Sequence, residues 1–504
     1  MTRPRGLGPT RGDLLAAVTV ALVLVPQSLA YAQLAGLPPV NGLYVAIAAP
    51  LAASAVASSP YLQTGPVALT SLLTAGALAA LAEAGSADYV GLAALLALLV
   101  GAVRLALGLL RAGAIAYLMS DPVVRAFTVT GAFLILASQV PAMLGAPGRG
   151  GNPLTGAARA LADPGSWHPP ALGYAAATLA LVMGARRLGP FVPGALIATV
   201  AALAVATWTG YDGPTVGTVP AGLPPLGGNL PWGSLPALLL PGLVIATVGF
   251  AEPAAVARHY AVRTRSRWDP DRELVSQGLA NLASGVVSGY PAGGSFSRTA
   301  LAFDTGAATR WSGALTGLVV AALLPLTPLL SGLPSAVLAA VVVAAVTGLI
   351  RLGTLPRLWH LSRPQFGVAV VTGAAVLALA PRLDVALGIG VACALAVHLW
   401  RELRVDVVAE LRGGTLRLAP SGVLYFLSAP TFEERVLRAA AAHPGVARVE
   451  LDLRRLGRID VTGALALRTT LDALRADRHV VVTHVPDHAR RLVGPADRTE
   501  EEWQ

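Results

Sequence analysis

The sequence has little charge and no lysine, and each shortage excludes a class of protein. Only 13% of the 504 residues are charged, while 55% are hydrophobic and the mean hydropathy is +0.65. A soluble domain carries roughly 25% charged residues, so this chain lacks the polar groups to cover itself in water. Every basic residue is an arginine, so the lysine of a G-x-x-x-x-G-K-[ST] phosphate loop is missing. We expect a lipid-embedded chain that hydrolyses no nucleotide through that motif.

Cysteine is almost absent as well. The one cysteine, Cys393, lies in an apolar run, which excludes a disulfide framework and a thiolate metal site. No nucleophile–base constellation or metal cluster is evident, so we expect neither an enzyme nor a cofactor or metal. The net charge of +10 does not indicate nucleic acid, because its distribution matters more than its total. The apolar run from Leu14 to Val25 continues into Pro26 without a small-residue cleavage site, so we expect no cleaved signal peptide.

Apolar segments long enough to cross about 30 Å of hydrocarbon recur from Leu14 to Trp400. We expect about fourteen membrane spans. Their predicted centres are Val20, Ala48, Leu73, Leu96, Phe133, Leu179, Leu203, Ile245, Leu282, Ala300, Leu318, Val341, Val370 and Leu387. The segments near Leu73 and Ala300 are short and are entered through Gly and Pro, unlike uniform membrane helices.

Arginines alternate between the connections, as the positive-inside rule requires. The basic connections, counted from the N-terminus and then after every second span, hold Arg3, Arg5, Arg11, Arg111, Arg186, Arg187, Arg258, Arg263, Arg265, Arg267, Arg310, Arg351, Arg357, Arg363, Arg401 and Arg404. The opposite loops hold Glu83, Asp88 and Asp212 and few arginines. The pattern predicts a multi-pass protein of the cell inner membrane with both termini in the cytoplasm.

A weak internal repeat divides the membrane part. In each half a helix carries a proline beside a polar side chain, Pro26–Gln27 and then Glu252–Pro253. About forty residues later, a Tyr/Pro/Gly stretch leads into a new apolar helix, in SSPYLQTGPVALTSLL and in SGYPAGGSFSRTALAF. Seven spans per half is an odd number, so the second copy must enter the membrane inverted. Inverted repeats with interrupted helices indicate a midplane binding site in secondary transporters.

Composition changes after Arg401, where charge becomes dense. The spacing of apolar residues predicts strands in LRLAPSGVLYFLSA, ARVELDLRR and VVVTHVP. It predicts helices in ALALRTTLDALRAD and DHARRLV. We therefore expect a soluble β–α–β–α domain. The predicted boundaries are a cytosolic N-terminus at 1–12, a transport domain at 13–402 with repeats at about 13–210 and 236–402, the soluble domain at 403–495 and a flexible tail at 496–504.

GPVALTS and GSFSRTA carry the candidate binding chemistry. If Pro66 and Ser295 begin half-helices near the bilayer centre, each presents backbone N–H groups and a partial positive charge there. Two such ends facing one another make an anion site. The hydroxyls of Ser295 and Ser297 would add donors, and Arg298 would add full charge. The alternative is a pair of buried caps, but caps alone require no arginine inside a membrane helix, where burial is costly.

Three further polar residues lie at membrane depth. Glu252 is a carboxyl in an apolar helix, a default functional candidate; since burial disfavours its charged form, it would carry a coupling proton. The alternative is a salt bridge to Arg298 that leaves Glu252 ionised and structural. Gln27 and Tyr31 lie four apart on one helix face, and either face the same cavity or make interhelical hydrogen bonds.

Three stretches of the sequence together resemble the sulfate permease (SulP) family, the anion transporters and exchangers that include prestin. They are VPQSLAYAQLAGLPPVNGLYVA, QTGPVALTS and GGSFSRTA. The resemblance covers most of the chain and is that of a bacterial member. It implies fourteen spans in a seven-plus-seven inverted repeat with core and gate domains, an elevator-like movement of the core and a homodimer. Its motifs imply a site that comprises Gln27, Tyr31, Val67, Ser297 and Arg298, with Glu252 facing it. The predicted substrate site also includes Pro66, Ser295 and Phe296 at the two half-helix starts.

The C-terminal region resembles the STAS domain of this family and of bacterial anti-sigma-factor antagonists. Where those antagonists have Asp-Ser-Ser-Gly, this chain has Asp460-Val461-Thr462-Gly463. The phosphorylated serine corresponds to Val461, so that switch is absent.

Sodium-dependent bicarbonate members have a threonine four positions after the acidic residue of the eighth span, where this chain has Val256. A sodium site is therefore disfavoured, and proton symport is favoured over sodium symport.

These observations favour a secondary active transporter of a small anion, proton-coupled and of elevator type. The favoured substrate is a carboxylate or dicarboxylate, with sulfate and bicarbonate left open. One alternative is an anion channel or uncoupled exchanger. Another is a membrane sensor whose STAS domain is the output. The expected partners are the anion, protons, membrane lipid, a second copy of the chain and a cytosolic partner of the STAS domain; no nucleic acid is expected.

Overall fold

The computed structural model describes residues 8–114, 120–148, 151–189, 192–223, 226, 229–348, 350 and 353–485. The chain forms two compact units, residues 1–392 and 393–504. Arg3, Arg5, Arg351, the predicted helix DHARRLV and the predicted tail at 496–504 lie outside the described residues.

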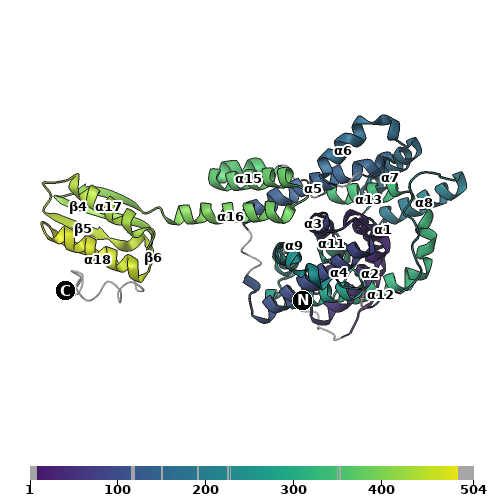
Figure 1. The fold of residues 1–504 in the computed structure, drawn as a ribbon. Helices are drawn as coiled ribbons and strands as arrows, with labels where there is room; N and C mark the ends of the chain where they lie inside the picture. The colour runs from purple at the N-terminus through teal and green to yellow at the C-terminus, as the bar shows by residue number, and fades with distance from the viewer. Residues whose placement is uncertain are drawn as a thin grey trace. The chain divides into compact units, whose positions relative to one another are not determined.

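The first unit repeats one order of elements twice (Figure 1). The first copy is α1 (Arg11–Leu34), α2 (Pro39–Val56), β1 (Gln63–Gly65), α3 (Ala68–Leu78), α4 (Ala87–Leu109), α5 (Asp121–Leu144), α6 (Pro153–Ala162), α7 (Pro169–Leu188) and α8 (Gly194–Thr209). The second copy is α9 (Leu235–Thr264), α10 (Pro270–Val286), β2 (Gly293–Ser295), α11 (Phe296–Asp304), α12 (Trp311–Leu323), α13 (Ser335–Thr347), α14 (Thr354–Leu361), α15 (Arg363–Leu379) and α16 (Leu383–Glu402). In both copies a short strand follows the second helix, and the sixth helix, α6 or α14, is short. This shared order confirms the predicted repeat.

Each predicted span centre lies inside a different helix of this unit, which confirms the reading of the apolar runs. Within the described part of the chain, seven helices are long and apolar enough to cross a membrane, and four apolar helices of 10–17 residues accompany them. The sequence reading missed α6 and α14, which are shorter than a span. Large apolar side chains such as Trp208, Leu240 and Leu329 are more than half exposed, as lipid-facing side chains are. The chain is a multi-pass membrane protein.

The helices pack in two groups. The core group is α1–α4 with α9–α12, in which α10 packs on α4 and α2, and α1 packs on α2 and α12. The gate group is α5–α8 with α13–α15, in which α5 packs on α13 and α15, and α7 packs on α8 and α13. Helices α4 and α10 approach closely because Gly101 and Gly278 face the partner backbone, where an added Cβ would lie 2.6 Å from Leu282 N and 2.7 Å from Leu105 N.

The second unit is a mixed sheet with two helices. Its elements are β3 (Asp406–Arg412), β4 (Thr415–Leu424), α17 (Ala429–Ala441), β5 (Arg448–Asp452), β6 (Leu456–Ile459), α18 (Val461–Arg475) and β7 (His479–Thr483). The strand order is β3-β4-β5-β7, with β6 also paired to β4. Strands β3 and β4 form an antiparallel hairpin around Gly413 and Gly414, both at positive φ, whereas β4–β5 and β5–β7 are parallel.

The core of this unit lies between the sheet and the helices α17 and α18, which pack on each other (Figure 1). Phe432 and Val436 of α17 and Leu467 of α18 are fully buried in it, as are Leu418 and Leu451 of the sheet. The predicted strands and the helix of ALALRTTLDALRAD are confirmed. The prediction was incomplete, because it missed β3, the separate strand β6 and the amphipathic helix α17.

Candidate functional site

The centre of the membrane unit is a two-stranded ladder between the two repeats. Strands β1 and β2 pair antiparallel, with Gln63 opposite Ser295 and Gly65 opposite Gly293. Because β1 and β2 are equivalent elements of the repeats, their antiparallel pairing is what a local twofold axis produces. The two segments that the sequence singled out therefore meet inside the core group.

Each strand leads directly into a short helix. Val67 is the N-cap of α3 and Ser295 is the N-cap of α11. The helices have 11 and 9 residues, which at 1.5 Å per residue is about 16 and 13 Å, roughly half of a 30 Å bilayer core. Short helices therefore begin directly after Ser295 and two residues after Pro66, as predicted to within two residues, whereas their position near the bilayer centre stays a prediction. Their first turns carry the backbone N–H groups and the positive end of the helix dipole.

Arg298 joins the two half-helices. Its side chain is 2% exposed, and its Nη2 donates to the carbonyl of Pro66 at 2.8 Å. Its Nη1 donates to Oε1 of Gln27 on α1 at 3.3 Å. Among the described residues, its Nε is buried and has no hydrogen-bond partner. A buried guanidinium with a spare donor is costly without an anion to receive it.

The acidic and aromatic candidates surround this guanidinium. Tyr31 and Glu252 lie within electrostatic range of Arg298, as does the fully buried Tyr290. Glu252 is half-buried, and the adjoining Pro253 packs against Gly294 of β2. In the described part of the chain, Glu252 and Arg298 form no ion pair within 4 Å. The alternative of a direct salt bridge is therefore wrong for this conformation.

The remaining candidates differ in their surroundings. Pro66 and Val67 are buried at the start of α3. Ser295 is buried and accepts a hydrogen bond from the backbone N–H of Arg298 at 3.4 Å. Ser297 is exposed, with its hydroxyl 3.3 Å from that of Ser295. Phe296 is also exposed and lies beside the rings of His259 and Tyr260 on α9. The structure thus places Phe296 next to α9 and away from the Arg298–Gln27 contact.

Arg104 is a buried cation that sequence reasoning missed. It is fully buried on α4 and donates to the carbonyls of Ile245 and Ala246 on α9 and of Ala292 before β2, at 3.0–3.1 Å. Gly249 makes room for it, since an added Cβ there would lie 2.7 Å from Nη2 of Arg104. The only sequence signal is a single arginine within the apolar run of α4. Arg104 ties α4 to the helix of Glu252 and to the strand that leads to Arg298.

Neutral hydrogen bonds fix the ladder as well. Gln63 donates from Nε2 to the hydroxyl of Ser312, and Gln277 donates to the hydroxyl of Thr64 at 2.8 Å. Asn281 accepts from the backbone N–H of Ala292 at 2.9 Å. The backbone N–H of Ala292 is thus satisfied from α10, and α10 and α12 hold the side chains of β1, as non-helical chain buried in a membrane protein requires.

The STAS-like tetrad lies at the start of α18 in the second unit. Asp460 is the N-cap, and its Oδ1 accepts from the backbone N–H of Gly463 at 2.6 Å. Val461 and Thr462 are exposed at the first turn. The position that antagonists phosphorylate is thus presented to solvent but carries an isopropyl group in place of a hydroxyl.

Asp452, at the end of β5, is the buried carboxyl of this unit. Burial opposes its ionisation, but hydrogen bonds from the backbone N–H of Arg454 and from the guanidinium of Arg417, with the charge of His484, outweigh burial and hold the pKa of Asp452 below its usual range. Asp452 is therefore an ionised anchor of the sheet.

These features define a class: a membrane protein of two inverted repeats whose broken helices meet inside the core group. Comparison with known proteins gives the family. The sequence pattern of the sulfate permease family matches residues 10–372, and that of the STAS domain matches residues 406–498. The chain belongs to the sulfate permease family and carries a C-terminal STAS domain, as the sequence motifs predicted.

Curated relatives include the chloroplastic sulfate transporter 4.1 of Arabidopsis thaliana, 33% identical over 415 residues, which cover 80% of this chain and 61% of that protein. A probable sulfate transporter of Mycobacterium tuberculosis is 37% identical over 375 residues, covering 73% of this chain and 67% of that one. This chain thus spans about three fifths of the length of the plant relative.

Solved structures share the fold. Murine Slc26a9, described as an anion transporter in the inward-facing state, superposes with a TM-score of 0.87 at 20% identity, covering 98% of this chain and 88% of that one. The transmembrane domain of the cyanobacterial bicarbonate transporter BicA gives a TM-score of 0.67 at 22% identity, covering 78% of this chain and 98% of that domain. At these identities the likeness concerns the fold.

Proposed function

We propose that this protein is a secondary transporter of a small anion, and not an enzyme. The observation that carries the proposal is the buried guanidinium of Arg298, held between two half-helix N-termini with its Nε unpartnered among the described residues. Such a place is electropositive, so an anion gains from entering it. Relatives that are named sulfate transporters support the anion class.

The proposed site is formed by Gln27, Tyr31, Pro66, Val67, Ser295, Ser297 and Arg298. Phe296 would border it from the side of α9. A carboxylate or dicarboxylate suits one guanidinium plus backbone and hydroxyl donors, because carboxylate oxygens accept such bonds in a planar arrangement. Sulfate and bicarbonate offer the same acceptor chemistry and remain substrates to test.

Glu252 is the proposed proton carrier. It lies close enough to Arg298 to feel its charge but makes no ion pair with it within the described residues, so protonation of Glu252 would break no ion pair. Entry of an anion beside Arg298 would offset part of the positive charge that favours ionised Glu252. Anion binding would thereby favour protonation, which is the linkage that symport requires. The core group, which carries all these residues, would move against the gate group as an elevator.

The chain is proposed to lie in the cell inner membrane as a homodimer, with both termini in the cytoplasm and the STAS domain open to a cytosolic partner. The alternative is an anion channel or uncoupled exchanger built on the same site. Uptake of labelled succinate, sulfate and bicarbonate into proteoliposomes, with and without an inward proton gradient, separates these functions. Accumulation driven by the gradient supports symport; accumulation that ignores the gradient leaves the alternative; no flux of any anion overturns the proposal.

A further inference from the structure

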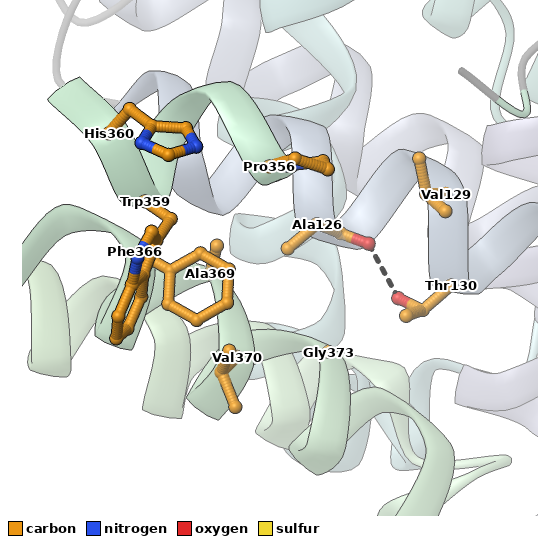
Figure 2. A pocket seen from close by; sticks show the side chains of 10 residues that line it. All are labelled: Ala126, Val129, Thr130, Pro356, Trp359, His360, Phe366, Ala369, Val370 and Gly373. Atoms are coloured by element: carbon orange, nitrogen blue, oxygen red, sulfur yellow. Dashed lines mark hydrogen bonds between the residues drawn. The ribbon is translucent and has the colours of Figure 1, made fainter. Parts of the chain in front are cut away.

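A cavity lies within the gate group, far in sequence from the residues of the anion site. Its volume is about 490 Å³, and it is lined by α5, α14 and α15 (Figure 2). Its walls are apolar: Ala126 and Val129 from α5, Trp359 from α14, and Phe366 and Val370 from α15. The hydroxyl of Thr130 donates to the carbonyl of Ala126 within α5, which leaves the methyl group of Thr130 for the cavity.

The cavity opens to the outside of the protein, since Trp359 and Val370 are each about half exposed at its edge, 47% and 52%. Figure 2 shows the ring of Trp359 beside that of Phe366 on one wall, with Val129 and Thr130 opposite. The rings of Trp359 and Phe366 pack edge to face, with their centroids 5.2 Å apart. In a membrane-spanning unit, an apolar cavity with a side opening is accessible to hydrocarbon chains.

The helices α14 and α15, which line it, carry basic and aromatic residues. Arg357 and Arg363 are exposed on α14 and at the start of α15, His360 lines the cavity, and the guanidinium of Arg363 lies 5.4 Å from the centroid of the Trp359 ring. Tryptophan and arginine on a short amphipathic helix mark the membrane–water interface. The arginine pattern puts this connection on the cytoplasmic side, where the leaflet is anionic.

We propose that this cavity holds one acyl chain of an anionic phospholipid from the cytoplasmic leaflet, with the phosphate of its headgroup against Arg357 and Arg363. The volume falls within the roughly 300–1,000 Å³ of ligand cavities. Two exposed cations on the helices that line an apolar cavity match a molecule with an anionic head and a hydrocarbon tail. The cavity shares no residue with the anion site, so lipid binding and anion binding can be altered separately.

Quenching of Trp359 by acyl-brominated lipids tests the proposal on the full chain in vesicles of phosphatidylcholine. The signal of Trp359 is the difference between the chain and its Trp359→Phe variant. We expect brominated phosphatidylglycerol to quench Trp359 several-fold more than brominated phosphatidylcholine. Substituting Arg357→Gln with Arg363→Gln should abolish that preference, whereas the exposed pair Arg265→Gln with Arg267→Gln should preserve it. Val370→Trp fills the cavity and should reduce quenching of Trp359 by both lipids. In this background the signal of Trp359 is the difference between Val370→Trp and the double variant Val370→Trp with Trp359→Phe.

Equal quenching of Trp359 by the two brominated lipids in the unsubstituted chain would overturn the anionic headgroup. Quenching that Val370→Trp leaves unchanged would mean that the lipid contacts only the outer surface. Both quenching measurements use protein that elutes as a single folded species. The comparison of the two brominated lipids uses the chain with an unsubstituted cavity, so it tests the proposal even if Val370→Trp fails to fold.

Discussion

Arg298 donates a hydrogen bond to the carbonyl of Pro66 at 2.8 Å, so the cation of the second broken helix is held by the residue just before the N-cap of the first. The two repeats therefore share one charged centre. The same guanidinium contacts Gln27 on α1, which brings a third segment of the core group to this point.

Replacing Arg298 with alanine should weaken anion binding. A hydrogen bond to a charged group contributes about 1.5–3 kcal/mol, so a loss of about 2–3 kcal/mol corresponds to a roughly 30- to 150-fold weaker affinity. Binding of labelled anion to purified protein measures the change. Arg187→Ala removes an exposed arginine at the end of α7 and serves as the matched control. Equal affinities in the two variants would remove Arg298 from the site.

Replacing Glu252 with glutamine should uncouple transport from protons while sparing anion binding. Glutamine keeps the size of the side chain but takes up no proton, so an inward proton gradient should no longer drive accumulation. Concentrative uptake in proteoliposomes, together with counterflow of labelled anion at equal pH, measures the two properties. Glu83→Gln, at an exposed loop position, should behave as the unsubstituted chain. Gradient-driven uptake that survives in Glu252→Gln would assign coupling to another group.

Replacing Gly249 with alanine should displace Arg104. The new Cβ would lie 2.7 Å from Nη2 of Arg104, and crowding of this kind costs about 1–3 kcal/mol. The apparent unfolding temperature in detergent should fall. Gly173→Ala on α7 is the control, because no atom lies within 4 Å of its added Cβ and alanine favours a helix more than glycine does. Similar unfolding temperatures for the two variants would show that Arg104 does not need this space.

The STAS unit should lose stability in acid through Asp452. Its pKa is lowered in the folded state, so its contribution is fully present above the unfolded value of about 3.9 and is lost as the pH falls through the lower folded pKa. Hydrogen exchange of β5 peptides in the full chain should be faster in Asp452→Asn than in the unsubstituted chain at neutral pH. The exposed Asp472→Asn is the control, and equal protection of β5 in both variants would contradict this account.

Much of the membrane architecture was predictable because the physical signal is strong. A span needs a long apolar run, and each predicted centre, from Val20 to Leu387, lies in its own helix. The starts of α3 and α11 were predictable for a related reason, since Gly and Pro entries mark a broken backbone. The helices α6 and α14 were missed because they are short and amphipathic, and they resemble loops when apolar length is the criterion.

The contacts of the site were less accessible from sequence. Arg104 reads as an ordinary arginine near a helix end, because its partners are the backbone carbonyls of Ile245, Ala246 and Ala292 and carbonyls carry no sequence signature. Tyr290 stands out in the sequence only as the tyrosine of the Tyr/Pro/Gly stretch that leads into α11. The orientation of Phe296 beside Tyr260 depends on the tertiary placement of α9, which local spacing does not specify.

The central claim is that the transported anion binds where α3 and α11 begin, and one protection measurement tests it directly. Removing the single cysteine by Cys393→Ala leaves a background in which Ser297→Cys introduces one thiol beside Arg298, at an exposed position. A saturating concentration of the transported anion should slow modification of this thiol by a methanethiosulfonate reagent several-fold, and should leave a thiol introduced by Ser166→Cys unaffected. A modification rate at position 297 that does not change with the anion would contradict the account.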